Sequence, residues 1–228
     1  MTCVWITRSE PGAGRLERAL NEAGFQSVNA PVLTTEVVRG IAPSEEFDVT
    51  VFLSEHAVKY AIEGKWRSAA PVVAVGPTTA DALRSAGLQP VHPGQASSEG
   101  VFELFEQQYS DVQSVLIVAG AGGREDLAKW LKDKGVRVRT WITYRRILLR
   151  PFVDIGGCDA VVVSSAEALS RIAELCFEYA NIDEDQLSVL VPSDRVAEVA
   201  ASFGFSRIFN CDGANPQAVV ATLIDQAL

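Results

Sequence analysis

A glycine-rich turn at residues 117–125, with the sequence IVAGAGGRE, is the first candidate for chemistry in this chain. An apolar stretch ends in a run of alanine and glycine, and Arg124 follows where a helix is expected to begin. Backbone N–H groups at such a turn, together with the helix dipole, can bind an anion. A nucleotide is not favoured, because Glu125 stands where GxGxxG requires its third glycine and no Gly-Lys-Ser/Thr follows. Binding of another anion and a tight turn without a ligand both remain open.

Metal-binding and nucleic-acid-binding patterns are weak in this sequence. The two histidines, His56 and His92, are isolated, and the four cysteines form no CxxC motif or Cys/His pair. We therefore expect no metal site and cysteines that serve as small apolar residues. The formal net charge is −9 and no basic cluster is present, so nucleic acid is not expected as a partner.

Length and apolar content favour a globular protein. The chain has 228 residues, of which 48% are hydrophobic, and no apolar run approaches the roughly 20 residues that a membrane span requires. The beginning, MTCVWITRSE, lacks the basic and apolar regions of a signal peptide. We expect a protein of the reducing cytoplasm without a membrane partner.

Short apolar runs alternate with segments of helical period, such as LERALNEAGF and LAKWLKDKGV. Continuous apolar strands beside amphipathic helices predict parallel sheets that are covered on both faces. The predicted strands are 4–7, 27–32, 49–53, 72–75, 115–118, 136–144, 160–164 and 189–192.

An internal repeat indicates two equivalent units. A shift of 111 residues places 3–33 on 114–144 without a gap, and the same shift places FDVTVFLSEHAV on CDAVVVSSAEAL. Further along, the shift becomes 117, where Ala80 meets Ala197 and Gly87 meets Gly204. Two units of roughly 110 residues are therefore expected, and a cleft between two such units is a common place for a ligand.

The order of several motifs resembles the uroporphyrinogen-III synthase family over nearly the whole chain. They are Thr7-Arg8, FLSEHAV, AVGPTTADALRSAGL, SSEG at 97–100, GGREDLAKWLKDKG, the Tyr144-Arg145 pair and VVSSAEAL. The resemblance implies an α/β fold with two similar doubly wound parallel-sheet domains, flavodoxin- or Rossmann-like, joined by a two-stranded antiparallel linker. Domain one would comprise 1–33 and 149–228, domain two 40–138, and the linkers 34–39 and 139–148.

The resemblance also implies a substrate, hydroxymethylbilane, a linear tetrapyrrole with eight carboxylates. A hydro-lyase reaction would close it to uroporphyrinogen III with loss of water and inversion of ring D, in tetrapyrrole biosynthesis. No cofactor is required, and we expect a monomer that contacts the preceding pathway enzyme transiently. Because the bilane ionises and closes unaided to the uninverted isomer, catalysis would act mainly through orientation.

Two other classes of protein remain as alternatives. A non-catalytic two-domain small-anion-binding protein would share the repeat but would normally carry an export signal. A nucleotide-dependent enzyme would need a better phosphate loop than 120–124.

The turns at the carboxyl ends of the predicted strands are the expected binding surface, because ligands of open α/β sheets lie there. With a negative net charge, the protein must supply local donors at helix N-termini for the substrate carboxylates. The candidate substrate-binding residues are Thr7, Arg8, Ser54, Glu55, His56, Gly76, Thr78, Thr79, Gly122, Gly123, Arg124, Ser165, Ala166 and Ser193.

Purely structural roles are open for several of these residues. Ser54, Thr79 and Ser165 could be helix N-caps, with or without a ligand contact. Arg8 and Arg124 could form surface ion pairs with Glu10 and Glu125. His56 reads as an exposed residue at a helix start rather than as a catalytic base.

Tyr144 is the candidate catalytic residue. A tyrosine at the interdomain linker matches the candidate acid of the family that the chain resembles, and a phenol keeps its proton for donation at neutral pH. Packing at a hinge is the alternative role.

Overall fold

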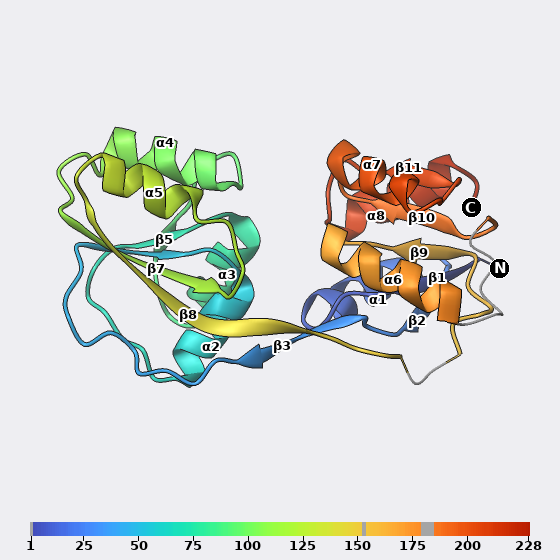
Figure 1. The fold of residues 1–228 in the computed structure, drawn as a ribbon, viewed down its shortest axis with the longest axis horizontal. Coiled ribbons are helices and arrows are strands. Elements are labelled where there is room, and N and C mark those ends of the chain that lie inside the picture. The colour runs from blue at the N-terminus through green and yellow to red at the C-terminus, as the bar shows by residue number, and fades with distance from the viewer. Residues whose placement is uncertain (1, 152–153, 179–184) are drawn as a thin grey trace. The chain divides into compact units, whose positions relative to one another are not determined.

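The computed structural model describes residues 2–151, 154–178 and 185–228, which form an α/β protein with parallel sheets (Figure 1). The chain divides into two compact units. Unit 1 consists of residues 1–34 and 147–228, and unit 2 consists of 35–146. The chain therefore passes between the units twice, and unit 1 is built from both ends of the sequence. The assignment of these units as independent domains stays a prediction.

Unit 1 contains a five-stranded parallel sheet in the order β11-β10-β9-β1-β2. Its strands are β1 (Cys3–Ile6), β2 (Gln26–Asn29), β9 (Ala160–Val162), β10 (Ser188–Val191) and β11 (Ile208–Asn210). Numbered along unit 1, this order is 2-1-3-4-5, which is a common doubly wound arrangement. Its switch point lies between β1 and β9, where the chain first winds to one side of β1 and then to the other.

Two pairs of helices cover the sheet of unit 1. The helices α1 (Gly12–Glu22) and α8 (Pro216–Asp225) bury Leu16, Leu20, Val219 and Leu223 in one apolar cluster. The helices α6 (Ala166–Glu178) and α7 (Asp194–Ser202) bury residues such as Leu169, Ile172 and Val196 in another. Spacings of three and four residues place each set on a single helix face. Burying each large aliphatic side chain contributes about 1.5–3 kcal/mol.

Unit 2 repeats this plan in a permuted chain order. Its sheet has the order β3-β8-β7-β4-β5-β6. The strands are β3 (Leu33–Val37), β4 (Val49–Phe52), β5 (Val72–Ala74), β6 (Pro90–Val91), β7 (Ser114–Gly120) and β8 (Arg137–Leu148). Through the sequence repeat, β7, β8 and β4 are equivalent to β1, β2 and β9, so the switch point of unit 2 lies between β7 and β4.

The helices of unit 2 also lie on both faces of its sheet (Figure 1). One face is covered by α2 (Glu55–Glu63) and α3 (Pro77–Ser85), and the other by α4 (Ser98–Gln108) and α5 (Asp126–Asp133). The apolar strands β4, β5 and most of β7 are buried because both faces are covered.

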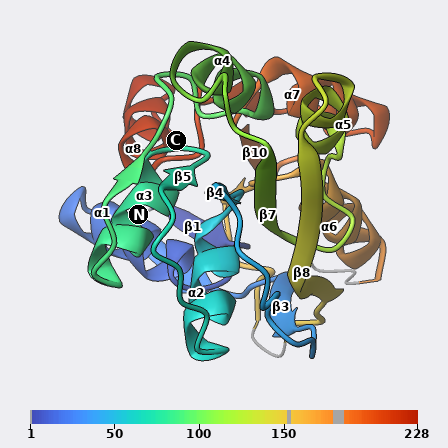
Figure 2. The ribbon, with the colours of Figure 1, turned by 90° about the vertical axis from the view of Figure 1, so that its left-hand side faces the viewer.

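Strand β8 changes its pairing along its length. It lies beside β7 (Figure 2) and is parallel to it as far as Ile142. An irregularity in the register then brings Tyr144, not Thr143, opposite Gly120. From Thr143 onward β8 also pairs with β3, and the Val38 N–H donates to the Thr143 carbonyl. The Leu149 N–H likewise donates to the carbonyl of Val32, so numbering rises on one strand as it falls on the other and the pair is antiparallel.

The structure confirms the expected fold class and places a strand at each of the eight predicted runs. It adds β6 and β11, which the sequence analysis did not predict. The predicted strand 136–144 and the predicted linker 139–148 overlap, and β8 covers most of both as it runs unbroken from Arg137 to Leu148.

Candidate active site

The candidate turns follow the carboxyl ends of the strands in each unit, as parallel pairing requires. In unit 2 the turns after β4 and β7 flank the switch point, and in unit 1 the turns after β1 and β9 do so. Ligands of doubly wound sheets bind at this position. The two switch points are therefore the natural places to look for binding groups.

Tyr144 lies beside the switch point of unit 2 and is buried, with 4% of its surface exposed. Its hydroxyl is 2.9 Å from the Oγ of Ser54, and its carbonyl accepts a hydrogen bond from the Ala121 N–H at 2.7 Å. Side chains along a regular strand point alternately to its two faces, and a β-bulge changes the direction of one of them. At the irregularity in β8, two successive residues, Thr143 and Tyr144, are both buried. The bulge therefore turns the phenol toward the first turn of α2.

Gly120 makes room for this phenol. A Cβ atom at Gly120 would lie 2.4 Å from Cζ and 2.8 Å from the hydroxyl oxygen of Tyr144. Side chains do not tolerate contacts this short, so only glycine fits while the ring keeps its place. The beginning of the glycine-rich turn thus has a packing role toward Tyr144.

Ser54 links the phenol to the N-terminus of α2. Its backbone is extended, and its Oγ accepts a hydrogen bond from the Ala57 N–H at 3.0 Å, which is the geometry of an N-cap. The hydroxyl of Ser54 can also donate to the oxygen of Tyr144 while it accepts from Ala57. The cap role proposed from the sequence is confirmed, and contact with a ligand stays a prediction.

Two aromatic side chains lie against the phenol, and one of them is held by Thr35. The Tyr60 ring stacks on Tyr144 with centroids 5.9 Å apart, and the His56 ring lies 5.6 Å from it. Tyr60 donates from its hydroxyl to the Thr35 carbonyl at 2.8 Å and lies 3.1 Å from the Thr35 hydroxyl. These contacts hold α2 against β3 and fix the plane of the phenol. His56 is half-buried, not exposed as expected, and Glu55 beside it is the first residue of α2.

The remainder of the glycine-rich turn is exposed. Gly122 has a φ of +70°, a conformation that favours glycine. Arg124 forms ion pairs at 2.7 Å with Asp126 and Glu99, instead of the expected Glu125. Hydrogen bonds to these carboxylates, first to Glu99, raise the pKa of the Arg124 guanidinium. Because the side chain is 62% exposed and a guanidinium has five N–H donors, it can still bind a further anion.

The turn after β5 differs from the prediction in one respect. Gly76 is the N-cap of α3, Pro77 and the exposed Thr78 follow, and Thr79 is the third helical residue, 4% exposed. The interpretation of Thr79 as a cap is therefore wrong, because the helix begins three residues earlier. A Cβ at Gly76 would lie 2.6 Å from that of Ala96, so this glycine permits close packing.

In unit 1 the candidates flank the switch point between β1 and β9. Thr7 is fully buried and its hydroxyl donates to the carbonyl of Val162 at 2.6 Å, so it joins the ends of these strands. Arg8 is half-buried and donates from Nη1 to the carbonyl of Ala214 at 2.9 Å. These contacts position the turn after β1.

The other candidates of unit 1 lie at helix N-termini. Ser165 accepts a hydrogen bond from the Ala168 N–H at 3.2 Å, so its predicted cap role is confirmed. Ala166 is the first residue of α6. Ser193 stands at the N-cap of α7, and its carbonyl accepts from Val196 and Ala197.

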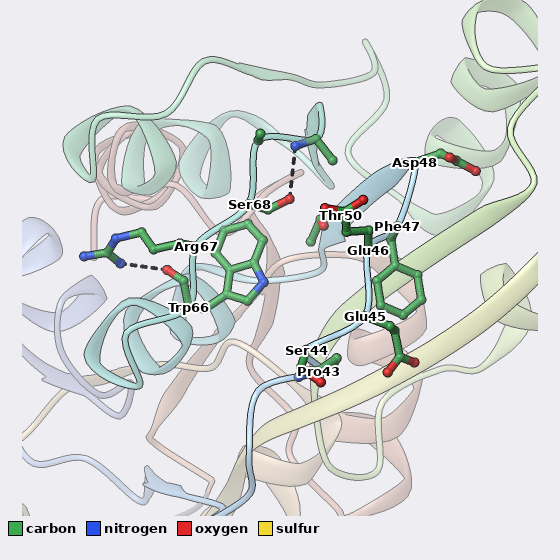
Figure 3. A pocket seen from close by; sticks show the side chains of 12 residues that line it. Pro43, Ser44, Glu45, Glu46, Phe47, Asp48, Thr50, Trp66, Arg67 and Ser68 are labelled. Carbon is green, nitrogen blue, oxygen red and sulfur yellow. Dashed lines mark hydrogen bonds between the residues drawn. The ribbon is translucent and has the colours of Figure 1, made fainter.

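A hollow of about 770 Å³ lies at the other end of the unit 2 sheet, where the strands begin. Its lining comes from residues 43–48, 50 and 66–70, in and just before β4 and β5 (Figure 3). Trp66 and Phe47 stand on two sides of it, while the Asp48 side chain points away from Trp66. Because it lies at the amino ends of the strands, away from every candidate residue, we do not assign the site to this hollow.

Sequence reasoning missed Thr35 and Tyr60. His56 and Tyr60 are four residues apart, so their positions on one face of α2 could have been inferred from helical spacing. The contact with Thr35 joins residues 25 apart and leaves no such local signal. Within the described ranges, no helix has the length and apolar character to cross a membrane, and no three metal-ligating side chains gather.

Comparisons with known proteins point to one family. The family described as uroporphyrinogen-III synthase HemD matches residues 14–221. The chain is 29% identical to uroporphyrinogen-III synthase of Salmonella typhimurium, over 96% of this chain and 99% of that protein. It is 26% identical to the uroporphyrinogen-III synthase of Escherichia coli, with the same shares covered.

Solved structures share the fold. Uroporphyrinogen-III synthetase from Helicobacter pylori aligns with a TM-score of 0.66 at 14% identity, over 99% of each chain. A mutant uroporphyrinogen III synthase from Thermus thermophilus aligns with a TM-score of 0.59 at 16% identity, over 100% of this chain and 98% of the other.

Proposed function

The chain belongs to the uroporphyrinogen-III synthase family, and from this premise we propose how its residues carry out the reaction. The activity is that of a lyase of tetrapyrrole biosynthesis. Hydroxymethylbilane loses water and closes to uroporphyrinogen III, with ring D inverted. Because the bilane closes unaided to the uninverted isomer, the protein must both assist departure of the hydroxyl and control which carbon is attacked.

The observation that carries the mechanism is the Tyr144 phenol, held 2.9 Å from the capping hydroxyl of Ser54. We propose that Tyr144 donates its proton to the departing hydroxyl group of the bilane. Ser54 donates a hydrogen bond to the phenol oxygen, and the Ala57 N–H donates to Ser54. This chain leads to the positive end of the α2 dipole, which favours the negative charge that the phenol oxygen acquires.

The surroundings of Tyr144 serve orientation. The stacked Tyr60 ring and the glycine at position 120 define where the ring lies. Only 4% of Tyr144 is exposed, so a substrate can reach a small part of it. General acid catalysis needs hydrogen-bond reach between the donor and the leaving group, and a fixed ring keeps that distance constant.

The carboxylates of the bilane are proposed to bind at the strand-end turns. In unit 2 these are Ser54, Glu55, His56, Gly76, Thr78, Thr79, Gly122, Gly123 and Arg124, and in unit 1 Thr7, Arg8, Ser165, Ala166 and Ser193. The support is their position at the carboxyl ends of parallel strands and at helix N-termini. The proposal also includes a cytoplasmic monomer without a cofactor that meets the preceding enzyme transiently.

The experiment is an isomer-resolved assay with freshly made hydroxymethylbilane. The chain should form type III product faster than the unaided closure forms type I. Tyr144→Phe should lower the type III rate on the order of 10²-fold, the lower end for loss of a general acid. Type III should remain the product, because the fold of the bilane depends on many donors.

Tyr109→Phe is the matched control. Tyr109 belongs to the same unit but lies at the C-cap of α4, outside the candidate turns, so loss of its hydroxyl should leave the rate unchanged. Unchanged turnover of Tyr144→Phe would assign Tyr144 to packing and reject the acid role. Release of type I alone would assign it to steering of the closure.

A further inference from the structure

Two of the four cysteines lie side by side at the amino edge of the unit 1 sheet. Cys3 is the first residue of β1, and Cys158 stands two residues before β9, the neighbouring strand. Their Sγ atoms are 3.5 Å apart, and both side chains are half-buried. Both thiols are free and close enough to react with one another.

The backbone keeps the two thiols together. The Asp159 N–H donates to the Cys3 carbonyl at 2.9 Å, and the Cys3 N–H donates to the Asp159 carboxylate at 2.8 Å. These bonds extend the pairing of β1 and β9 by one residue and fix the residues that flank the sulfur atoms. The pairing of β1 with β9 therefore holds the two cysteines close together.

We propose that Cys3 and Cys158 form an oxidation site, which a peroxide converts into an intramolecular disulfide. Closing the gap from 3.5 Å to a bond of about 2.05 Å requires a shift of about 1.5 Å, shared between two side chains. Rotation about the Cα–Cβ bonds supplies such a shift without breaking the ladder. This inference does not rest on the proposed catalytic role of Tyr144.

The chemistry proceeds in two balanced steps. A thiol first reduces the peroxide and becomes a sulfenic acid, with release of one water molecule from hydrogen peroxide. The second thiol then displaces hydroxide from the sulfenic sulfur, so that the disulfide forms and a second water leaves. Burial, followed by the neighbouring Cys3 thiol, raises the pKa of Cys158 to about 12. We expect peroxide to oxidise Cys3 first and Cys158 then to attack the sulfenic sulfur, with its proton passing to the departing hydroxide.

The remaining cysteines provide an internal control. Cys176 and Cys211 are each 7% exposed and belong to different apolar clusters on opposite faces of the unit 1 sheet. Burial also raises the pKa of the Cys211 thiol. Both should react far more slowly than Cys3, since oxidation requires access and thiolate character.

The disulfide would join the two chain segments of unit 1 directly. Cys3 belongs to residues 1–34 and Cys158 to 147–228, and the only other covalent connection between these segments is the chain of unit 2. Such a link restricts the unfolded chain and should raise the unfolding midpoint of the oxidised protein.

In the test, the reduced protein is treated with hydrogen peroxide, and catalase then removes the remaining peroxide. Free thiols are alkylated, and the protein is digested and its peptides are mapped without reduction. The expected product is monomeric, has lost two hydrogen atoms and contains one cross-linked peptide pair with Cys3 and Cys158. Cys176→Ser should behave like the unchanged chain. Cys158→Ser should instead accumulate a sulfenic acid on Cys3, which dimedone traps.

Phenylarsine oxide provides a second measurement on the unsubstituted protein. This trivalent arsenical bridges two adjacent thiols with loss of water, and should protect Cys3 and Cys158 together from alkylation. Failure to protect both, cross-links between separate chains, or overoxidation of Cys3 in the unsubstituted protein without a disulfide would each overturn the proposal. None of these outcomes bears on turnover of the bilane.

Discussion

Replacement of Gly120 by alanine tests whether the position of the Tyr144 ring determines the rate. The new Cβ would lie 2.4, 2.7 and 2.8 Å from Cζ, Cε2 and the hydroxyl oxygen of the phenol. The ring must therefore move by about 1 Å to restore an ordinary contact. Such a shift breaks or lengthens the 2.9 Å bond to Ser54, and a misplacement of this size can lower a rate about 10²-fold.

The substitution should also destabilise the protein. Overpacking of a filled core typically costs about 1–3 kcal/mol. For a chain of 228 residues each kcal/mol lowers the unfolding midpoint by about 2–4 °C, so a fall of about 2–12 °C is expected. Rates must accordingly be measured well below the unfolding midpoint of the variant.

The assay follows type III formation from fresh hydroxymethylbilane, beside thermal unfolding. Gly94→Ala is the matched control, because Gly94 lies outside the proposed binding turns and its Cβ would have no neighbouring atom within 4 Å. In the Tyr144→Phe background, Gly120→Ala should have little further effect on the rate, since the phenol is already lost. A Gly120→Ala protein with full turnover would refute the link between ring position and rate.

Three further outcomes are expected. Ser54→Ala and Ser165→Ala should each lose about 1 kcal/mol of stability as cap deletions, whereas Ser54→Ala should slow type III formation more than Ser165→Ala does; equal rates would contradict the link to Tyr144. Arg124→Gln should raise KM about two- to fivefold with unchanged kcat, an effect that added salt should remove. Hydrogen bonds from the Ser114 side chain, then from the Gln113 N–H, hold the pKa of Asp48 below its ordinary value of 3.8. The ionised carboxylate therefore stabilises the fold at pH values above 3.8, and this stabilisation disappears as the pH falls through the lower pKa of the folded state. The free energy of unfolding of Asp48→Asn should therefore be lower than that of the unchanged chain at neutral pH, and the difference should disappear in strong acid.

Most of the fold could be predicted because its signals are local. Each of the eight apolar runs predicted as strands became a strand, and helical spacing such as that of Leu16 and Leu20 marked the buried faces. Strands β6 and β11 were missed because their apolar stretches, Pro90–Val91 and Ile208–Phe209, are only two residues long. The start of α3 was misjudged because Thr79 is a good cap residue, whereas Gly76 and Pro77 define the helix start.

The arrangement around Tyr144 could be predicted only in part. The family resemblance picked out Tyr144 and the serine at the start of α2, but the bulge in β8 depends on its pairing with Gly120, which no local pattern records. Arg124 pairs with Glu99, 25 residues away, for the same reason. The roles of these residues toward the substrate stay predictions.

The two-segment construction of unit 1 has a consequence for synthesis on the ribosome. Strand β1 lies between β2 and β9, yet β9 begins 154 residues after β1 ends. At 5–20 residues per second, roughly 8–30 s pass before that neighbour emerges. Unit 2 is contiguous and can fold within this interval. During the same time β1, with Val4, Trp5 and Ile6, has no strand to pair with on the side that β9 will occupy. The nascent chain thus carries an exposed apolar strand through most of its translation, and it should depend on chaperones more than a circular permutant that begins at residue 147.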